Sequence, residues 1–427
     1  MAIKLLNYQL LLTSWVIDKE TIMQKSKRLI LLFVIWLGFV AVLAGMWQQL
    51  TAVAAPQAAN RYVAPGGVDG TNDCTNPNNP CGSVMYAVQQ TDAGDTVLIA
   101  AGFYTETDTI NVFRDVTIQG AGLDQTIVSV PTDPNIWRVF LVYGGVNASI
   151  SHLTLRNAER SGIMNIGSLT LDQVSITDNR GVLGGAGIYN DSSAVITITD
   201  SLISNNGQGT DVGAAMLNFG QATIQRALVV GNKAGNYGGG VHNQGTLLLE
   251  NVTFTLNEAE AGTAVSNGDS GVITMTNVTI ARNTNTQTSP TQASAISNFG
   301  ASIQASNTII ADNGPNQQCS GTTPLTSLGH NLNSHNDCNF DQPTDLLFAD
   351  PLLDTFAAVS GTPNWVSVLT LADNSPALDA GSSATCPATD ARGLPRPMDG
   401  DSNGTAVCDI GAYEAQRFGV FLPVIVR

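Results

Sequence analysis

Asparagine recurs at nearly constant intervals through the middle of this 427-residue chain. Each of six asparagines follows a short, mostly alternating triplet after two further residues, as Asn257 follows Val252-Thr253-Phe254. Successive members are 27, 26, 25, 26 and 30 residues apart. A chain that repeats one phrase at a period of about 25 residues folds into a stack of similar units, a solenoid. The six positions are Asn179, Asn206, Asn232, Asn257, Asn283 and Asn313.

A second asparagine column keeps step with the first. Small residues, often glycines, precede an apolar residue, one variable residue and then asparagine, as in the segment Gly238 to Asn243. Because the two columns share one period, both belong to the same repeating unit. The members are Asn190, Asn218, Asn243, Asn267 and Asn298, with Asn165 as an earlier copy.

The phrases between the asparagines predict strands. They alternate with period two and are rich in Val, Ile and Thr, which favours strands over helices. Stacked units then pair each strand in parallel with its copy one period later. An asparagine amide is both donor and acceptor, so amides stacked about 4.8 Å apart form a hydrogen-bonded ladder. We therefore interpret both columns as structural.

These repeats resemble the right-handed parallel β-helix of pectin-lyase-like proteins. The phrases RYVAPGG from Arg61 and GDTVLIA from Gly94 are similar to the opening segment of exported members, where a short amphipathic helix plugs the open end. The resemblance implies an all-β, right-handed parallel β-helix solenoid of about nine to ten coils, with an N-terminal helical cap and a C-terminal loop-rich module. Residues 61–146 would form the cap and first coils, and residues 147–318 the repeats.

The N-terminal region indicates a secretory signal. Residues 1–54 are interpreted as leader and signal peptide, and we expect translation to start at Met23, because basic residues follow it and an apolar run begins at Leu29. Ala52-Val53-Ala54 fits a small-x-small cleavage site. A signal anchor that stays in the membrane is the alternative. We expect a secreted or cell-surface protein that meets the membrane only through its signal or anchor.

Six cysteines lie outside the repeats. Six cysteines permit fifteen pairings, but a stiff rod separates the two ends of the chain and favours pairing between neighbours. Such staples suit loop-rich segments and an oxidising compartment. No CxxC motif occurs and the four histidines are scattered, so zinc is not indicated. The expected pairs are Cys74 with Cys81, Cys319 with Cys338, and Cys386 with Cys408.

The C-terminal part departs from the repeat. The phrases NSPALDAG from Asn374, DARGLPRP from Asp390 and CDIGAYE from Cys408 resemble the choice-of-anchor module of bacterial surface β-helix proteins. The resemblance implies that residues 319–414 form a disulfide-stapled module that closes the helix. Residues 415–427 would be an apolar tail.

Two features of this region and of the composition bear on ligands. Asp399, Asp401 and Asn403 follow a DxDxNG pattern, the first half of a calcium loop, although Ile410 occupies the twelfth position in place of glutamate. A structural Ca²⁺ and a plain Asx-turn loop are both possible interpretations, and no other cofactor is indicated.

The formal net charge of -16 argues against nucleic-acid partners. We expect a monomer.

The repeats offer a binding face more readily than a catalytic centre. Lyases and hydrolases of this fold need clustered acids, but the repeat acids stand mostly alone in turns, and Lys233 with Glu258 predicts a surface ion pair. No catalytic residue is therefore assigned. The residue before each asparagine of the second column should point outward. Tyr189 and His242, two coils or about 10 Å apart, are the candidate ligand-binding residues of this stripe.

These observations predict an exported, non-catalytic β-helix surface protein of adhesin-like type. It would present a long face to a polysaccharide or to protein partners at the cell surface. A polysaccharide-active lyase or hydrolase of the same superfamily is the alternative. The identity of the ligand and the route of anchoring are not contained in the sequence.

Overall fold

The computed structural model separates the chain into residues 1–57 and residues 58–427. In the first unit, residues 23–25 and 27–41 are helical, and the predicted cleavage site lies outside the described residues. Among the residues described, no helix combines the length and the apolar character needed to span a membrane. The structure describes residues 23–25, 27–41, 57–131, 138–181, 184–207, 212–285, 294–314, 317–354, 357–358 and 367–416.

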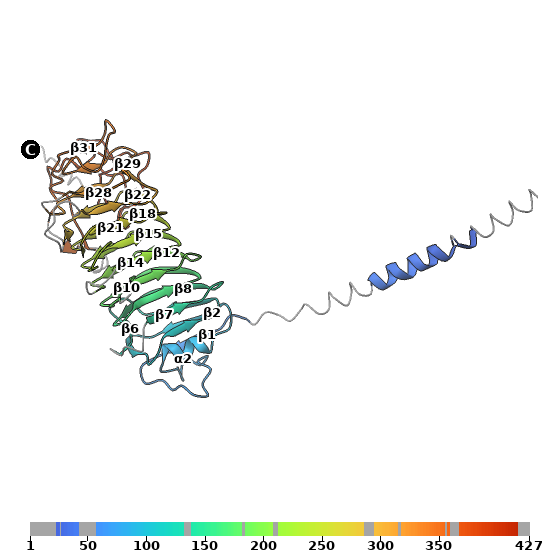
Figure 1. Ribbon diagram of the computed structural model, residues 1–427. Helices are drawn as coiled ribbons and strands as arrows, with labels where there is room; N and C mark the ends of the chain where they lie inside the picture. The colour runs from blue at the N-terminus through green and yellow to red at the C-terminus, as the bar shows by residue number, and fades with distance from the viewer. Residues whose placement is uncertain are drawn as a thin grey trace, which may run out of the picture. The chain divides into compact units, whose positions relative to one another are not determined.

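The second unit is a stack of parallel strands, shown side-on in Figure 1. The expected parallel β-helix is confirmed, since strands pair with their copies one coil later, for example Leu169 with Ile196 and Ile196 with Ala222. One 20-stranded sheet contains two columns of strands, which β8 and β10 join by running through both. The first column consists of β1 (Asn60–Val63), β2 (Asp95–Ile99), β5 (Val116–Gln119), β8 (Asn147–Arg156), β10 (Ser168–Thr177), β12 (Val195–Thr199), β15 (Gln221–Gln225), β18 (Thr246–Glu250), β22 (Val272–Thr276), β26 (Ser302–Ser306) and β29 (Thr326–Ser327).

The second column continues the same coils around the corner. Besides the later halves of β8 and β10, it contains β3 (Gly102–Thr105), β6 (Thr126–Ser129), β13 (Leu202–Ser204), β16 (Leu228–Val230), β19 (Thr253–Thr255), β23 (Thr279–Ala281), β27 (Ile309–Ala311), β30 (Leu332–Asn333) and β31 (Leu346–Leu347).

A nine-stranded sheet, sheet B, forms the remaining long face. Within the described chain its nine strands agree with the expected number of coils. They are β4 (Ile110–Val112), β7 (Arg138–Val142), β9 (Ser161–Asn165), β11 (Ile188–Asn190), β14 (Met216–Asn218), β17 (Val241–Asn243), β21 (Val265–Asn267), β25 (Ile296–Asn298) and β28 (Cys319–Gly321). Two short pairs complete the strands: parallel β20 (Glu258–Ala259) with β24 (Thr284–Asn285), and antiparallel β32 (Ala357–Ala358) with β33 (Ser367–Val368).

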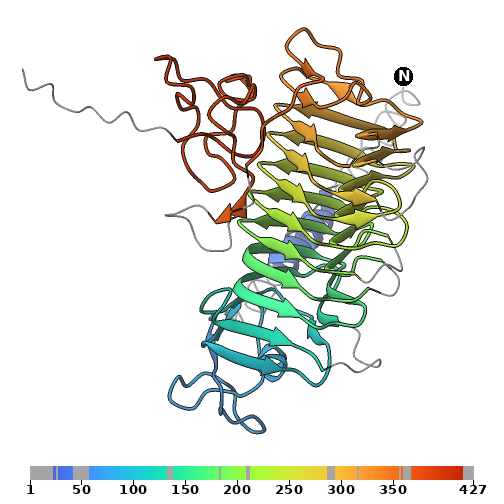
Figure 2. The ribbon, with the colours of Figure 1, turned by 90° about the vertical axis from the view of Figure 1, so that its left-hand side faces the viewer.

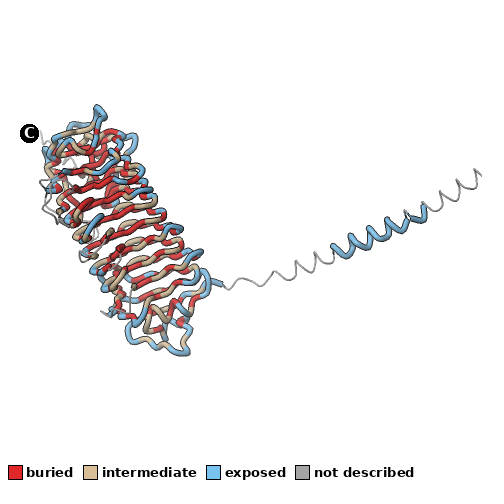
Figure 3. The backbone as a smooth tube through the Cα atoms, in the orientation of Figure 1, coloured by how far each residue is buried: buried red, intermediate tan, exposed pale blue. Residues whose placement is uncertain are grey.

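The core runs through the middle of the stack, where alternate residues of the longer strands of the first column are buried (Figure 3). Ile198, Ile224 and Leu249 occupy one register position on successive coils and are fully buried. Burying such apolar columns drives the stacking, at about 25 cal/mol for each Å² removed from water. Each coil therefore depends on its neighbours for a core.

Helix α2 (Val84–Gln89) plugs the N-terminal end, as the resemblance implied. Val84, Ala87 and Val88 are buried in the same core as the first coils. The Ser83 side chain accepts a hydrogen bond from the Tyr86 amide and so caps the helix, an interaction worth about 1 kcal/mol. Coil edges that would otherwise be exposed are covered.

All three expected cysteine pairs are disulfides. The residues from Cys319 onward, however, still belong to the coils: β28 pairs with β25, and β30 pairs with β27 and β31. The segment 367–416 packs along the side of the stack, as Figure 2 shows. The implied module that closes the helix is therefore divided, because residues 319–347 extend the solenoid and residues 367–416 cover its flank.

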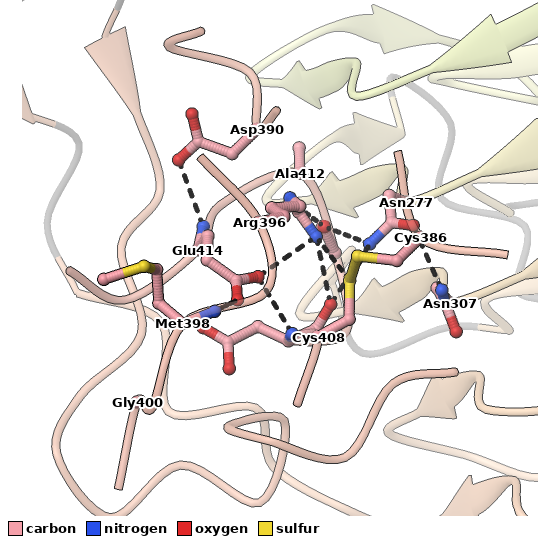
Figure 4. Close-up of polar contacts among 12 residues, drawn as sticks. Asn277, Asn307, Cys386, Asp390, Arg396, Met398, Gly400, Cys408, Ala412 and Glu414 are labelled. Atoms are coloured by element: carbon pink, nitrogen blue, oxygen red, sulfur yellow. Dashed lines mark hydrogen bonds and ion pairs between the residues drawn. A yellow bond between two sulfur atoms is a disulfide. The ribbon is translucent and has the colours of Figure 1, made fainter. Parts of the chain in front are cut away.

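A third, shorter asparagine column anchors this flanking segment. Asn277 Nδ2 donates to the Asp409 carbonyl and to the Gly411 carbonyl, both at 3.1 Å, and Asn307 Nδ2 donates to Asn277 Oδ1 at 3.1 Å (Figure 4). Gly411 has a φ of +98°, and a Cβ there would lie 2.7 Å from side-chain atoms of Ile309 and of Thr279. Glycine is required because the backbone itself touches the coil.

Buried charges organise the inside of the segment. Arg396 Nη1 lies 3.4 Å from Glu414 Oε2, and Arg396 Nη2 donates to the Gly411 carbonyl at 2.8 Å (Figure 4). Arg392 pairs with Asp390 at 2.5 Å. Burial, and next the charge of Glu414, raises the pKa of Asp409 to about 7. Paired and hydrogen-bonded charges of this kind hold the loops in one arrangement.

Candidate functional site

Both long asparagine columns form hydrogen-bonded ladders along the stack. In the first, each Nδ2 donates to the Oδ1 of the next asparagine at 2.9–3.0 Å, and the ladder ends on Gln318 Oε1. In the second, the corresponding bonds are 2.7–2.9 Å long and begin at Asn165. All of these amides are buried and bonded to one another, which holds the coils in register.

The outward positions of sheet B carry the residues expected to bind a ligand. Tyr189 aligns with Leu217 of the next coil, and Leu217 aligns with His242. The flanking segment 367–416 covers the second strand column, where Thr279 accepts a hydrogen bond from the Ala412 amide. Sheet B is a long face on which aromatic side chains can meet a ligand.

Six aromatic residues follow one another along this face. Phe113 and Tyr143 lie with their ring centroids 4.3 Å apart, and Tyr189 and Phe219 with theirs 5.6 Å apart. Phe113 is 58% exposed and Phe299 is 43% exposed. From β4 to β25 the sheet spans seven strand spacings, about 34 Å. We call these residues the aromatic strip: Phe113, Tyr143, Tyr189, Phe219, Tyr237 and Phe299.

The strip contains a pocket of about 390 Å³ near β17 and β21, which we call the β17–β21 pocket. Tyr237 and Phe299 form aromatic walls, while polar side chains complete its lining. Its size lies near the lower limit of small-ligand sites, which run from about 300 to 1,000 Å³. The polar lining comes from His242, Gln244, Ser266, Asn267 and Asp269.

His242 differs from the exposed residue that its outward position predicted. It is only 8% exposed, and its ring lies 6.4 Å from that of Tyr237. Its two ring nitrogens contact Ser266 Oγ at 3.2 Å and Gln244 Nε2 at 3.1 Å. Burial lowers the pKa of His242 to about 4, so the ring is neutral at physiological pH. Tyr189 lies outside this pocket and pairs instead with Phe219.

Glu258 and Asp200 of the repeats each form an ion pair. The hydrogen bond with Asp200 raises the pKa of Arg226, and Glu250 and Asp172 also lie near enough to raise it. Lys233 Nζ lies 2.7 Å from Glu258 Oε2, with both side chains well exposed, which confirms the predicted surface pair. Arg226 pairs with Asp200 at 2.6 Å. Within the described ranges, three or more potential metal-ligating side chains converge at two places, and neither includes an acid from residues 147–318. They are Cys319, Asp337 and Cys338, which include a disulfide, and Asp379, Asp399 and Asp401.

The second of these groups contains two of the three predicted calcium residues, Asp399 and Asp401. Carboxylate oxygens of Asp379, Asp399 and Asp401 lie within 4.8 Å of one another, and Asp379 was not foreseen from the motif. Asn403 stands beside them but donates its Nδ2 to Asp401, while its Oδ1 accepts the Thr405 amide. Three convergent carboxylates fit Ca²⁺, which prefers oxygen ligands. The group lies in the flanking segment, apart from the aromatic strip.

Most of the strip was missed at the sequence level. Phe219 and Phe299 directly follow asparagines of the second ladder in the phrase Asn-Phe-Gly, which occurs at Asn218 and again at Asn298. That repetition was the available signal. Tyr237 precedes its strand in a turn, and no periodic position marks it.

The fold and its aromatic face define a parallel β-helix protein with an extended surface strip. Solved structures similar to the chain include pectate lyase Pel9A, at 16% identity and a TM-score of 0.47 over 85% of this chain and 98% of that one. The Azotobacter vinelandii mannuronan C-5 epimerase AlgE6 A-module is similar at 14% identity and a TM-score of 0.38, over 62% of this chain and 80% of that one. Aspergillus niger pectin methylesterase is similar at 12% identity and a TM-score of 0.36, over 73% of this chain and 95% of that one.

No protein-family model matches the chain, and no curated protein matches it. Likeness to solved structures at 12–16% identity carries no argument about what this chain binds or catalyses.

Proposed function

We propose that this protein is an exported, non-catalytic β-helix protein that binds an extended glycan along sheet B. The aromatic strip is the observation that carries the proposal. A pyranose ring has one face of C–H groups that packs on an aromatic ring, and exposed aromatics on a rigid scaffold supply that surface at low entropic cost. A strip of about 34 Å along the rod suits a linear chain of several sugar units.

The distribution of acids favours binding over catalysis. Hydrolysis requires two carboxyl groups flanking one bond, and lyase chemistry requires a base beside a cation-binding acid cluster. The acids Asp200 and Glu258 are engaged by Arg226 and Lys233. A polysaccharide-active enzyme remains the second hypothesis, and the formation of product would establish it.

Export and surface display are part of the same proposal. Three disulfides and the basic-then-apolar leader support secretion. The flanking segment contains the three phrases that resemble a choice-of-anchor module, so we propose that it adjoins the anchoring end. We also propose that Asp379, Asp399 and Asp401 hold a structural Ca²⁺ there.

Retention on immobilised polysaccharides tests the function directly. The secreted, disulfide-intact protein is passed over a panel of neutral and anionic polymers, with release of reducing ends and of unsaturated product measured in parallel. Replacing both Tyr189 and Phe219 with alanine should lower retention at least tenfold. Leu248→Ala, which removes an exposed apolar side chain on the first strand column, is the matched control. Product formation, or equal retention of all variants, would overturn the proposal.

A further inference from the structure

We propose that the β17–β21 pocket is a subsite for a neutral pyranoside that presents two adjacent hydroxyl groups. The inference rests on the proposed glycan-binding function and specifies the class of sugar. The shape of the pocket floor, the arrangement of its hydrogen-bonding groups and the charge of its lining all favour such a sugar.

The floor is opened by a glycine. Gln244, Gly268 and Phe299 each directly follow an asparagine of the second ladder on three successive coils, so they stand in one column along the rod. Gly268 leaves the middle of this column without a side chain. A Cβ there would lie 3.0 Å from Gln244 Cγ, the flexible part of a side chain, so the position accepts a larger residue at the expense of the pocket.

Two aromatic residues bound this opening. Tyr237 is 39% exposed and Phe299 is 43% exposed. Phe299 follows β25, two coils beyond β17 and therefore about 10 Å along the rod. A sugar lying over Gly268 can place its C–H face on one of these rings while its hydroxyl edge meets the polar side chains.

The hydrogen-bond network determines which polar atoms are available. Gln244 Nε2 only donates, so His242 Nε2 accepts this bond and the proton of the neutral ring is on Nδ1. His242 Nδ1 then donates to Ser266 Oγ, and the Ser266 hydroxyl hydrogen remains to be donated. His242 is thereby a positioning residue, which orients Gln244 and Ser266 from below.

Asp269 selects the ligand by charge. It is exposed and is the one acidic side chain among the residues that line the pocket, and His242, the one basic side chain there, is neutral. A carboxylate has two acceptor oxygens and accepts from two adjacent hydroxyls at once. A sugar that carries a carboxylate or sulfate would instead place a second negative charge beside Asp269, without a cation in the lining to offset it.

The test uses the full secreted protein and two oligosaccharides of equal length and linkage. They differ only in C6, which is a hydroxymethyl group in one and a carboxylate in the other. Binding is measured by calorimetry in EDTA, so that no bridging cation masks the repulsion. The neutral member should bind at least tenfold more tightly. Gly268→Val should abolish binding of the neutral oligosaccharide. Asp269→Asn should weaken binding of the neutral oligosaccharide and reduce the preference for it over the acidic one.

The variants separate this inference from the proposed function. Equal or tighter binding of the acidic oligosaccharide, or unchanged neutral binding by Gly268→Val, would overturn the subsite. If the Tyr189 and Phe219 double variant still lost polymer retention in that case, the aromatic strip would stand without this subsite. If the unmodified protein were retained on no polymer, the proposed function would fail and the subsite with it.

Discussion

Replacing Asn232 with alanine should destabilise the solenoid at its centre. Asn232 Oδ1 accepts from the backbone amide and from the side-chain amide of Asn206, each at 3.0 Å. Its Nδ2 donates to Asn257 Oδ1 at 2.9 Å and to the Ile203 carbonyl at 2.9 Å. One residue therefore joins three consecutive coils.

The expected cost follows from the groups left behind. Alanine removes the acceptor of two N–H groups of Asn206, whose side chain is fully buried. A buried donor without a partner costs about 1–3 kcal/mol, so the two together cost about 2–6 kcal/mol. Because coils are stabilised mainly by their neighbours, the loss should also uncouple the two halves of the rod.

Guanidinium unfolding followed by circular dichroism measures the effect, with hydrogen exchange of β13, β16 and β19 locating it. Asn236→Ala provides the control, because it removes an exposed amide from the same coil; we expect it to change the free energy of unfolding by less than about 0.5 kcal/mol. If Asn232→Ala and Asn236→Ala unfolded at the same midpoint, the ladder would not stabilise the fold in the way argued.

Three further predictions concern the flanking segment. Burial and Glu414 raise the pKa of Asp409 from 3.8 to about 7, so the stability that it contributes is fully present below about pH 4 and is lost as the pH rises through about 7. Amide hydrogen exchange of residues 377–412, corrected for the intrinsic exchange rate at each pH, should be faster at pH 8 than at pH 5. Equal protection at the two pH values would contradict this prediction. Calcium should raise the melting temperature over that in EDTA, and Asp401→Asn should remove the rise; identical melting of the unmodified protein in both buffers would exclude the site. Gly411→Ala should expose the same residues to exchange at every pH, because its Cβ would collide with the coil, and protection equal to that of the unmodified protein would refute the close contact.

The solenoid was predictable because its determinants are local and repeated. Asn206 and Asn232 are recognised as equivalent from their constant spacing in the sequence. A column of asparagines at that spacing is explained by hydrogen bonds between stacked side-chain amides. Neighbouring cysteines such as Cys319 and Cys338 could likewise be paired, since a rod keeps distant ones apart. The sequence also located Asp399 and Asp401 through their spacing.

Other features depended on the tertiary structure, because they join residues with no common period. The turn residue Tyr237 reaches a pocket whose other wall, Phe299, lies 62 positions later. His242 has the predicted outward register, yet its neighbours bury it and keep it neutral. Asp379 joins Asp399 only after the loop folds.

The sequence by itself determined the stacking, because each coil repeats the pattern that buries and hydrogen-bonds its neighbour. Tertiary structure alone decided which face stays open. The flanking segment docks through Asn277 and Asn307, which keep the period of the coils, but their partner Gly411 lies more than 100 residues later, outside the repeat. Covering one flank while leaving sheet B available is the result of those long-range contacts, and it sets where a glycan can bind.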